Sequence, residues 1–151
     1  MAEFTFATEV IVRFAETDAQ GVAHHANYFV WLEVARIEYL ARFDGGYPEL
    51  QAQGIEATTL EVHLRYLEPA RFDDGLLIRA RCGDVRGARF RFEYAIERDR
   101  TLLADGWTAH ACVDAQTLRP TRVPAWLVTA LEAAEALAQE PAGSLDPPPG
   151  R

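Results

Sequence analysis

The chain has 151 residues, a mass of 16.9 kDa and a net charge of −8, and 49% of its residues are hydrophobic. This size fits one domain that buries its own core, and the acidic balance argues against nucleic acid or an anionic membrane as a partner. No apolar run approaches the roughly 18 residues of a membrane span, and the acidic start MAEFTFATEV lacks the basic region of a secretory signal. We therefore expect a cytoplasmic protein without membrane insertion. We expect a single domain over residues 1–139 and a disordered, Pro- and Gly-rich tail over residues 140–151.

The first third of the chain predicts a strand, a loop and a buried helix. Glu9–Glu16 alternates loosely between apolar and polar residues, which is typical of a strand. The polar segment TDAQGVAHHANY follows without any periodicity, and it predicts a loop. From Asn27 to Phe43 the spacing is helical, and Gly45, Gly46 and Pro48 end the helix. Apolar residues cover most of its circumference, so we expect a buried helix that is wrapped on several sides.

Alternating apolar residues predict four further strands, joined by tight turns. They lie at Leu60–Tyr66, Ile78–Cys82, Phe90–Ile96 and Leu103–Asp114. We expect the first of these to be half-buried through Leu60, Val62, Leu64 and Tyr66. On the last strand the apolar side carries Trp107, Ala109, Ala111 and Val113, which places Thr108 and His110 on the outer face with His63.

A second helix is predicted from Pro124 to about Gln139. Its buried stripe consists of Leu127, Leu131, Ala134 and either Leu137 or Ala138. The order is then β-α-β-β-β-β-α, and the short connections require antiparallel neighbours. We expect an α+β fold in which a curled antiparallel sheet of about five strands wraps one long apolar helix. Such a sheet leaves one face open and often pairs with a second copy, so we expect a homo-oligomer.

The two cysteines lie inside apolar alternations. Cys82 and Cys112 are 30 positions apart, without a C-x-x-C motif or a neighbouring histidine at motif spacing. We expect two reduced, half-buried core thiols, with a disulfide as the alternative.

The loop and the start of the first helix resemble the hotdog-fold thioesterases, most closely the 4-hydroxybenzoyl-CoA thioesterase family with its Tol-Pal-associated acyl-CoA thioesterase branch. The matching residues are Thr17, Asp18, Gly21, His25, Asn27, Tyr28, Glu33, Ala35 and Arg36. Arg65-Tyr66, Pro69-Ala70, Asp73-Asp74 and Arg122-Val123-Pro124 also match. Ala23 and His24 depart from the branched and aromatic residues frequent in the family, which bears on acyl-group specificity. The resemblance implies a hotdog fold, hydrolysis of acyl-CoA to a free acid and CoA, and a homodimer or homotetramer with active sites at the subunit boundary.

Asp18 is the candidate nucleophile or general base. Its carboxylate lies on a loop ahead of a helix N-terminus, where it can attack a thioester or activate water. The first N–H groups of that helix, near His25 to Tyr28, lack intrahelical acceptors and carry the positive end of the helix dipole. A thioester oxygen can bind there, and Gly21 permits the turn that brings Asp18 close. On spacing alone, an Asx-turn or capping role for Asp18 is the alternative, and the resemblance favours the catalytic role.

Other loop residues have candidate roles in the same site. For His25 we expect the backbone N–H to polarise the carbonyl, and its side chain is either catalytic or hydrogen-bonded to the backbone. Gly21, Asn27 and Tyr28 are the candidate substrate-binding residues, although Asn27 is first expected to cap the helix. His24 is adjacent to His25, so we expect its side chain to point elsewhere, to the pocket lining or the surface.

The sequence predicts neither a metal nor a bound cofactor, since CoA belongs to the substrate. The histidines show no H-x-x-x-H or H-x-H spacing, and G-x-S-x-G and phosphate-loop motifs are absent. Arg89 and Arg91, at i and i+2 on one strand face, suit the CoA phosphates. The alternative is a solvated strand face. The arginines that compete for the role are Arg79, Arg81, Arg119 and Arg122.

Two other functions fit the same fold. One is a hotdog dehydratase or hydratase, which needs a His/Asp pair in a different motif. The other is a non-catalytic acyl-thioester binding protein, which has no need for a carboxylate such as Asp18 beside the acyl carbonyl.

Overall fold

The computed structural model describes residues 4–43 and 45–137. Its strands are β1 (Phe6–Ile11), β2 (Ile55–Tyr66), β3 (Gly75–Arg86), β4 (Arg89–Arg98) and β5 (Thr101–Asp114). Its helices are α1 (Asn27–Leu40), α2 (Gly46–Ala52) and α3 (Ala125–Ala136), with a short 3-10 turn at Phe14–Glu16. No helix of the described residues is long and apolar enough to cross a membrane. The predicted tail over 140–151 and the predicted helix end at Gln139 lie outside the described residues.

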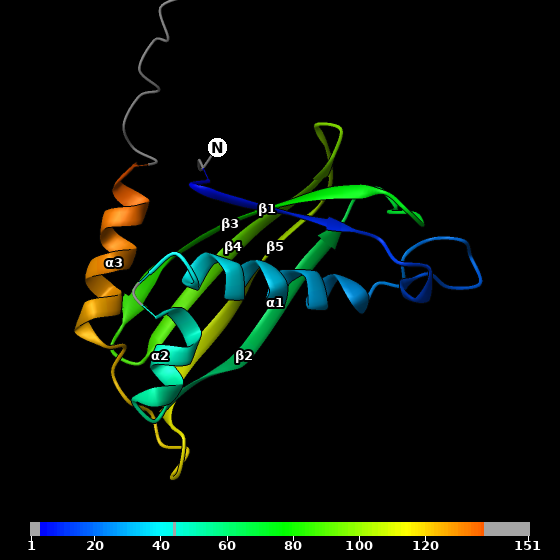
Figure 1. Ribbon diagram of the computed structural model, residues 1–151. Helices are drawn as coiled ribbons and strands as arrows, with labels where there is room; N and C mark the ends of the chain where they lie inside the picture. The colour runs from blue at the N-terminus through cyan, green and yellow to red at the C-terminus, as the bar shows by residue number, and fades with distance from the viewer. Residues whose placement is uncertain (1–3, 44, 138–151) are drawn as a thin grey trace, which may run out of the picture.

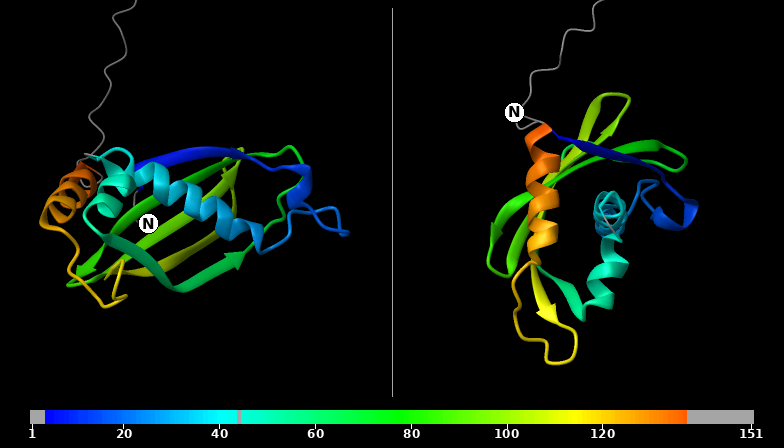
Figure 2. Two further views of the ribbon diagram at one scale, coloured as in Figure 1. Left: turned by 60° about the horizontal axis from the view of Figure 1, so that its bottom comes forward. Right: turned by 60° about the vertical axis from the view of Figure 1, so that its left-hand side comes forward.

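The five strands form one antiparallel sheet in the order β1-β3-β4-β5-β2. The sheet curls around α1, which crosses its concave face, as the view along the helix in Figure 2 shows. α2 continues from α1 toward the start of β2, and α3 lies at the far end of the sheet (Figure 1). The predicted α+β class and the curled sheet around one helix are confirmed.

The core lies between one side of α1 and the concave face of the sheet. The buried residues of α1 are Tyr28, Trp31, Leu32, Ala35, Tyr39 and Leu40. They meet alternate residues of β4; the rings of Tyr39 and Phe92, for example, lie 5.1 Å apart, edge to face. Phe29, Val30 and Ile37 are exposed on the same helix. The sequence predicted a buried helix that is wrapped on several sides; in a single chain the curled sheet covers one side of α1 and leaves these three residues exposed.

The first strand lies earlier in the chain than predicted, because the chain turns before the loop. β1 ends at Ile11, and Phe14–Glu16 forms a 3-10 turn in place of the predicted strand end. The Glu16 carboxylate accepts a hydrogen bond from the backbone N–H of Arg13 at 2.8 Å, which holds this turn. A local side-chain bond of this kind competes with strand pairing.

A short helix stands where the sequence predicted only the end of a helix. α1 stops at Leu40, three residues before the predicted Phe43, and Gly45 and Gly46 then take left-handed backbone conformations. Gly45 is the N-cap of α2, and Pro48 lies in its first turn. Proline is tolerated there because those N–H groups need no intrahelical acceptor.

Two polar residues of β5 are buried against the prediction, whereas Ala111 and Val113 are buried as predicted. Thr108 and His110 are 1% and 2% exposed and face α1, whereas the sequence placed them on the outer face. They are tolerated in the core because each makes hydrogen bonds to buried neighbours. The edge strand β2 is more exposed than the half-buried strand that the sequence predicted, since Leu60 and Val62 are 44% and 42% exposed.

The last helix and the cysteines follow the sequence only in part. Leu127 and Leu131 are buried as predicted, but Leu137 is 69% exposed; the alternative, Ala138, lies outside the described residues. Cys82 and Cys112 are free and fully buried rather than half-buried. The alternative disulfide is wrong, because β4 separates the strands that carry them. Burial raises the pKa of both thiols, that of Cys112 to about 11.

Candidate active site

The loop between the 3-10 turn and α1 is fixed by Glu16, a residue that the sequence analysis did not single out. Its backbone carbonyl accepts hydrogen bonds from the His24 N–H at 2.8 Å and from the Asn27 Nδ2 at 2.7 Å. Its buried carboxylate accepts one from the Trp31 Nε1 at 2.8 Å. Burial alone raises the pKa of Glu16, but the hydrogen bonds from Arg13 and Trp31 hold it below its usual value. Glu16 is therefore charged at neutral pH and ties both ends of the loop to α1.

Asp18 lies in a tight turn inside this loop. Its Oδ1 accepts a hydrogen bond from the Gln20 N–H at 2.8 Å, and its backbone carbonyl accepts one from the Gly21 N–H at 3.0 Å. The Asx-turn considered as an alternative is therefore present. It leaves Oδ2 without a hydrogen bond to the described residues, so the turn orients one oxygen and does not prevent the other from reacting. Gly21 has φ +78°, the left-handed conformation that favours glycine.

Asp18 lines a cavity of about 320 Å³, which we call the loop cavity. His25 and Tyr28 from the start of α1, and Tyr66 from the end of β2, line it with Asp18. Of the predicted site residues, the structure thus brings together Asp18, His25 and Tyr28. Gly21 shapes the turn but does not line the cavity.

The start of α1 presents free N–H groups beside this cavity. Ala26 is the N-cap, and it makes no side-chain capping bond. The backbone N–H groups of His25 and Tyr28 make no hydrogen bond to the described residues, whereas Asn27 N–H bonds to the carbonyl of His24 at 3.0 Å. Two unpaired donors at the positive end of a helix suit a developing oxyanion.

The histidine pair corrects one expectation. The rings of His24 and His25 stack with centroids 4.1 Å apart, so the two side chains do share a direction. The Nδ1 of His24 accepts a hydrogen bond from the Ala26 N–H at 3.2 Å. His24 is exposed and does not line the loop cavity. It satisfies one donor at the helix start, in the place of the absent capping side chain.

Asn27 does not cap the helix, which is a second correction. It is the first residue of α1, and its side chain reaches back to the carbonyl of Glu16. The residue lies away from the loop cavity, so in the described structure it positions the loop. The sequence suggested a cap because Asn precedes an apolar helical run, and the boundary differs by one residue.

Tyr66 lines the cavity, although the sequence placed it on a strand and in the Arg65-Tyr66 match to the family without a role in the site. Its hydroxyl donates to the His25 carbonyl at 2.9 Å, and its ring meets that of Tyr28 edge to face at 4.9 Å. This contact joins residues 41 positions apart. The hydrogen bond fixes the peptide plane that follows His25 at the helix start. The sequence signals for Tyr66 are its position at the end of an alternating strand and the Arg65-Tyr66 match to the family.

Arg89 and Arg91 lie outside the loop cavity. Both are on the convex face of β4, because the alternate residues Phe90 and Phe92 face α1. The guanidinium of Arg91 stacks on the Trp107 ring at 4.0 Å. Arg91 pairs with Ala109 of β5, and Tyr66, the residue of β2 that lines the cavity, pairs with Ala104 of β5. These two β5 residues are five positions apart, which corresponds to about 17 Å along the strand at 3.4 Å per residue. The role of Arg89 and Arg91 as CoA phosphate ligands stays a prediction.

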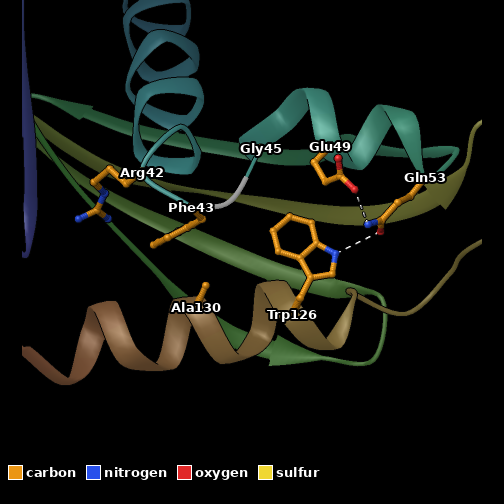
Figure 3. A pocket seen from close by; sticks show the side chains of 7 residues that line it. All are labelled: Arg42, Phe43, Gly45, Glu49, Gln53, Trp126 and Ala130. Carbon is orange, nitrogen blue, oxygen red and sulfur yellow. Dashed lines mark hydrogen bonds between the residues drawn. The ribbon is translucent and has the colours of Figure 1, made fainter.

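A larger cavity, of about 560 Å³, lies between α2 and α3 (Figure 3). Trp126 from α3 donates to the Gln53 side chain at 3.1 Å, and that side chain also bonds Glu49. Through these bonds the side chains of Trp126, Gln53 and Glu49 satisfy one another. Within the described residues no cluster of three or more His, Cys, Asp or Glu side chains has the arrangement of a metal site.

Known proteins resemble this chain over most of its length. The family model of the thioesterase-like superfamily matches residues 12–131. Acyl-CoA thioesterase YbgC of Haemophilus influenzae is 30% identical over 125 residues, which are 82% of this chain and 92% of that protein. Acyl-CoA thioester hydrolase YbgC of Escherichia coli is 31% identical over 124 residues, with the same coverage of 82% and 92%. The crystal structure of a hypothetical protein from Thermus thermophilus superposes with a TM-score of 0.79 at 36% identity, covering 85% of this chain and 98% of that one.

Proposed function

Because this chain belongs to the thioesterase-like superfamily, we propose that it hydrolyses acyl-CoA thioesters to a free acid and CoA, with Asp18 as the reacting carboxylate. One observation carries the residue assignment: Asp18 lines the same cavity as His25 and Tyr28, the two residues at the start of α1 whose N–H groups are free among the described residues. A carboxylate that reacts and a donor that stabilises an oxyanion are what thioester hydrolysis requires.

In the proposed mechanism the thioester oxygen binds the N–H of His25 at the helix start. Asp18 takes a proton from a water molecule while the water oxygen attacks the carbonyl carbon. The negative charge that forms on the thioester oxygen is stabilised by the helix N–H groups. The intermediate collapses and the C–S bond breaks. The thiolate sulfur takes the proton from Asp18, CoA leaves as the thiol, and the carboxylate is restored. The hydrogen bond from Tyr66 to the His25 carbonyl keeps this part of the backbone in place.

Asp18 can also act as the nucleophile. Its free Oδ2 then attacks the carbonyl carbon, the CoA thiolate leaves, and water hydrolyses the mixed anhydride. A single turnover in ¹⁸O-labelled water, followed by mass analysis of the peptide that contains Asp18, tests this route. Label in the Asp18 carboxylate indicates an anhydride that water opens at the aspartyl carbonyl. Label in the free acid alone is expected for the general base and for an anhydride that water opens at the acyl carbonyl.

The test of the reaction is release of free thiol from a panel of acyl-CoAs with aromatic, short and long acyl groups. We expect thiol release from at least one class, above the rate without protein. Binding of acyl-CoA without thiol release contradicts hydrolysis and indicates the non-catalytic binding protein. Addition of water across a double bond with the thioester intact indicates the hydratase.

We further propose that the protein is a dimer or tetramer that forms through the edge strand β2. This strand is 12 residues long, has no neighbour on one side within the described residues, and exposes Leu60, Val62 and Tyr66. A long apolar edge with unpaired N–H and C=O groups pairs readily with another strand. The exposed side of α1 adds Phe29 and Ile37 to the surface that a second copy can cover.

Light scattering should therefore give at least twice the chain mass of 16.9 kDa at micromolar concentration. Leu60→Glu should shift the protein toward the monomer, because it places a charge at the edge of β2. Leu118→Glu is the matched control, since Leu118 is exposed on the turn after β5 and should leave the mass unchanged. A wild-type mass of 16.9 kDa contradicts the proposal.

Arg89 and Arg91 are proposed to bind the CoA phosphates. Arg91→Ala should raise the KM for acyl-CoA more than it lowers kcat, because phosphate contacts are equal in the ground and transition states. The effect should weaken at high salt, where the Debye length falls below about 8 Å. Against an acyl-N-acetylcysteamine, which lacks the phosphates, wild type and variant should have equal kcat/KM. An equal loss on both substrates means that Arg91 supports the fold through its contact with Trp107.

A further inference from the structure

A third cavity, of about 220 Å³, lies between the C-terminal half of α1 and the concave face of the sheet, and we call it the helix cavity. Phe90, Phe92 and Ile37 give it apolar walls, and Arg36 and Glu33 of α1 are its charged residues. An apolar cavity of about 150 Å³ holds a benzene molecule. The helix cavity therefore has room for the end of an acyl group.

Arg36 lines this cavity with most of its hydrogen-bonding capacity unused. Its Nη1 donates to the Tyr94 hydroxyl at 3.1 Å. A guanidinium carries five N–H donors, and no carboxylate of the described residues lies within ion-pair distance of Arg36. A neutral donor is sufficient to satisfy the Tyr94 hydroxyl. The positive charge of Arg36 is therefore left for a ligand.

A buried chain of hydrogen bonds holds Arg36 in place. The Tyr94 hydroxyl lies 2.7 Å from the Thr108 hydroxyl, which lies 2.7 Å from the His110 Nε2. The His110 Nδ1 lies 3.3 Å from the Thr59 hydroxyl. Burial, together with the charge of Arg36, lowers the pKa of His110 to about 3, so this histidine is neutral. The chain of side chains thus orients Arg36 and adds no second charge.

The helix cavity lies along α1 from the loop cavity. Tyr28 lines the loop cavity and Arg36 the helix cavity, and eight residues of helix separate them by about 12 Å at 1.5 Å per residue. β2 contributes Tyr66 to the first and Thr59 to the second, with Val62 between them on the same face. An extended acyl chain advances about 1.2 Å per bond, the same as the extended protein backbone, which has three bonds per residue. An acyl chain of about ten bonds therefore spans the roughly 12 Å between the two cavities.

We propose that the helix cavity binds the far end of the acyl group, and that Arg36 selects acyl-CoAs whose chain of about ten carbons ends in a carboxylate. This inference rests on the proposed thioesterase function. A guanidinium binds a carboxylate through two parallel N–H···O bonds, which makes it selective for that group. Glu33 lines the same cavity, and its like charge opposes the bound carboxylate.

The experiment compares two substrates that differ only at the far end, decanoyl-CoA and the CoA monothioester of decanedioic acid. Wild type should prefer the carboxylate-ended substrate by at least about tenfold in kcat/KM, which corresponds to about 1.4 kcal/mol. Arg36→Gln should abolish this preference. Glu33→Gln should increase it, because it removes the opposing charge. Two substitutions on one helix thus have effects of opposite sign, which a general loss of folding does not produce.

Arg42→Gln is the matched control. Arg42 lies on the turn after α1, stacks on the Tyr39 ring at 4.3 Å, and does not line the helix cavity. It should leave the preference unchanged. Circular dichroism tests whether Arg36→Gln folds. If it does not fold, Tyr94→Phe takes its place. That variant keeps the ring but removes the hydroxyl that orients Arg36, and it should reduce the preference at least about threefold.

The outcomes separate this inference from the proposed function. Equal hydrolysis of the two substrates, or a preference that Arg36→Gln leaves intact, overturns the selectivity of Arg36 and leaves the thioesterase function standing. Hydrolysis of aromatic acyl-CoA alone also overturns the selectivity of Arg36 and leaves the thioesterase function standing. If no acyl-CoA of any class releases thiol, the proposed function itself is wrong.

Discussion

Asp18→Asn should lower kcat for the best acyl-CoA at least about 100-fold, the loss typical of a missing base or nucleophile. Asparagine has the size of aspartate, and its amide oxygen can still accept the hydrogen bond from the Gln20 N–H. It can neither attack a carbonyl carbon effectively nor accept a proton. The thermal midpoint should therefore stay near that of wild type while turnover is lost.

Asp114→Asn is the matched control for this substitution. The Oδ1 of Asp114 accepts hydrogen bonds from the N–H groups of Gln116 and Thr117, both at 2.9 Å, so Asp114 forms the same kind of turn far from the loop cavity. This variant should keep the wild-type kcat. A fall in kcat of less than about tenfold for Asp18→Asn contradicts the assignment of Asp18, since that corresponds to under about 1.4 kcal/mol of barrier.

Gly106→Ala should destabilise the fold by at least about 3 kcal/mol, the upper end for overpacking. Gly106 lies in β5 opposite Leu64 of the edge strand β2. A Cβ at this position lies 1.9 Å from the carbonyl oxygen of His63 and 2.9 Å from its carbonyl carbon. These atoms belong to the backbone, so β2 must move away from β5. Urea unfolding measures the loss, and activity should fall because β2 carries Tyr66.

Gly83→Ala provides the same substitution in the same sheet without a clash. Apart from Gly83 and its two chain neighbours, no atom of the described residues lies within 4 Å of a Cβ at this position, and the φ of Gly83 is not positive. This variant should keep the wild-type stability or gain up to about 1 kcal/mol from the lower entropy of its unfolded chain. If Gly106→Ala unfolds at the same urea concentration as Gly83→Ala, the β2–β5 contact is looser than described.

The elements with strong periodicity could be predicted from the sequence. The alternation at Phe90–Ile96 and the helical spacing from Asn27 reflect burial on one side, and both elements form as expected. α2 could not be predicted, because Gly45 and Gly46 are normally signals for the end of a helix. Here Gly45 also starts the next helix, and a helix of seven residues has too little sequence for its period to appear.

The inner and outer faces of β5 could not be assigned from polarity. Thr108 and His110 are polar, and a pattern based on hydrophobicity places them outside. Their buried hydrogen bonds come from Tyr94 on β4 and Thr59 on β2. Partners on other strands are known only after the strand register is known, which one sequence does not provide.

The candidate site was predictable where its residues are neighbours in the chain. Asp18, His25 and Tyr28 lie within one loop and the following helix turn, so their spacing in the sequence already implies that they meet. Tyr66 joins them across 41 positions, and Glu16 acts through its backbone carbonyl, which no residue type reveals. The sequence therefore indicated the proposed reacting group but not the contacts that hold it in place.

The buried thiols decide how this protein can be labelled. A thiolate reacts with maleimides and disulfide reagents, and burial keeps Cys82 and Cys112 protonated and out of reach. The folded protein itself should therefore give no thiol signal in an assay that measures the thiol of released CoA. A cysteine introduced on the surface should be the only position to take a fluorophore. Pairs of such positions across β2 would report distances between the subunits of the proposed dimer without removal of a native cysteine.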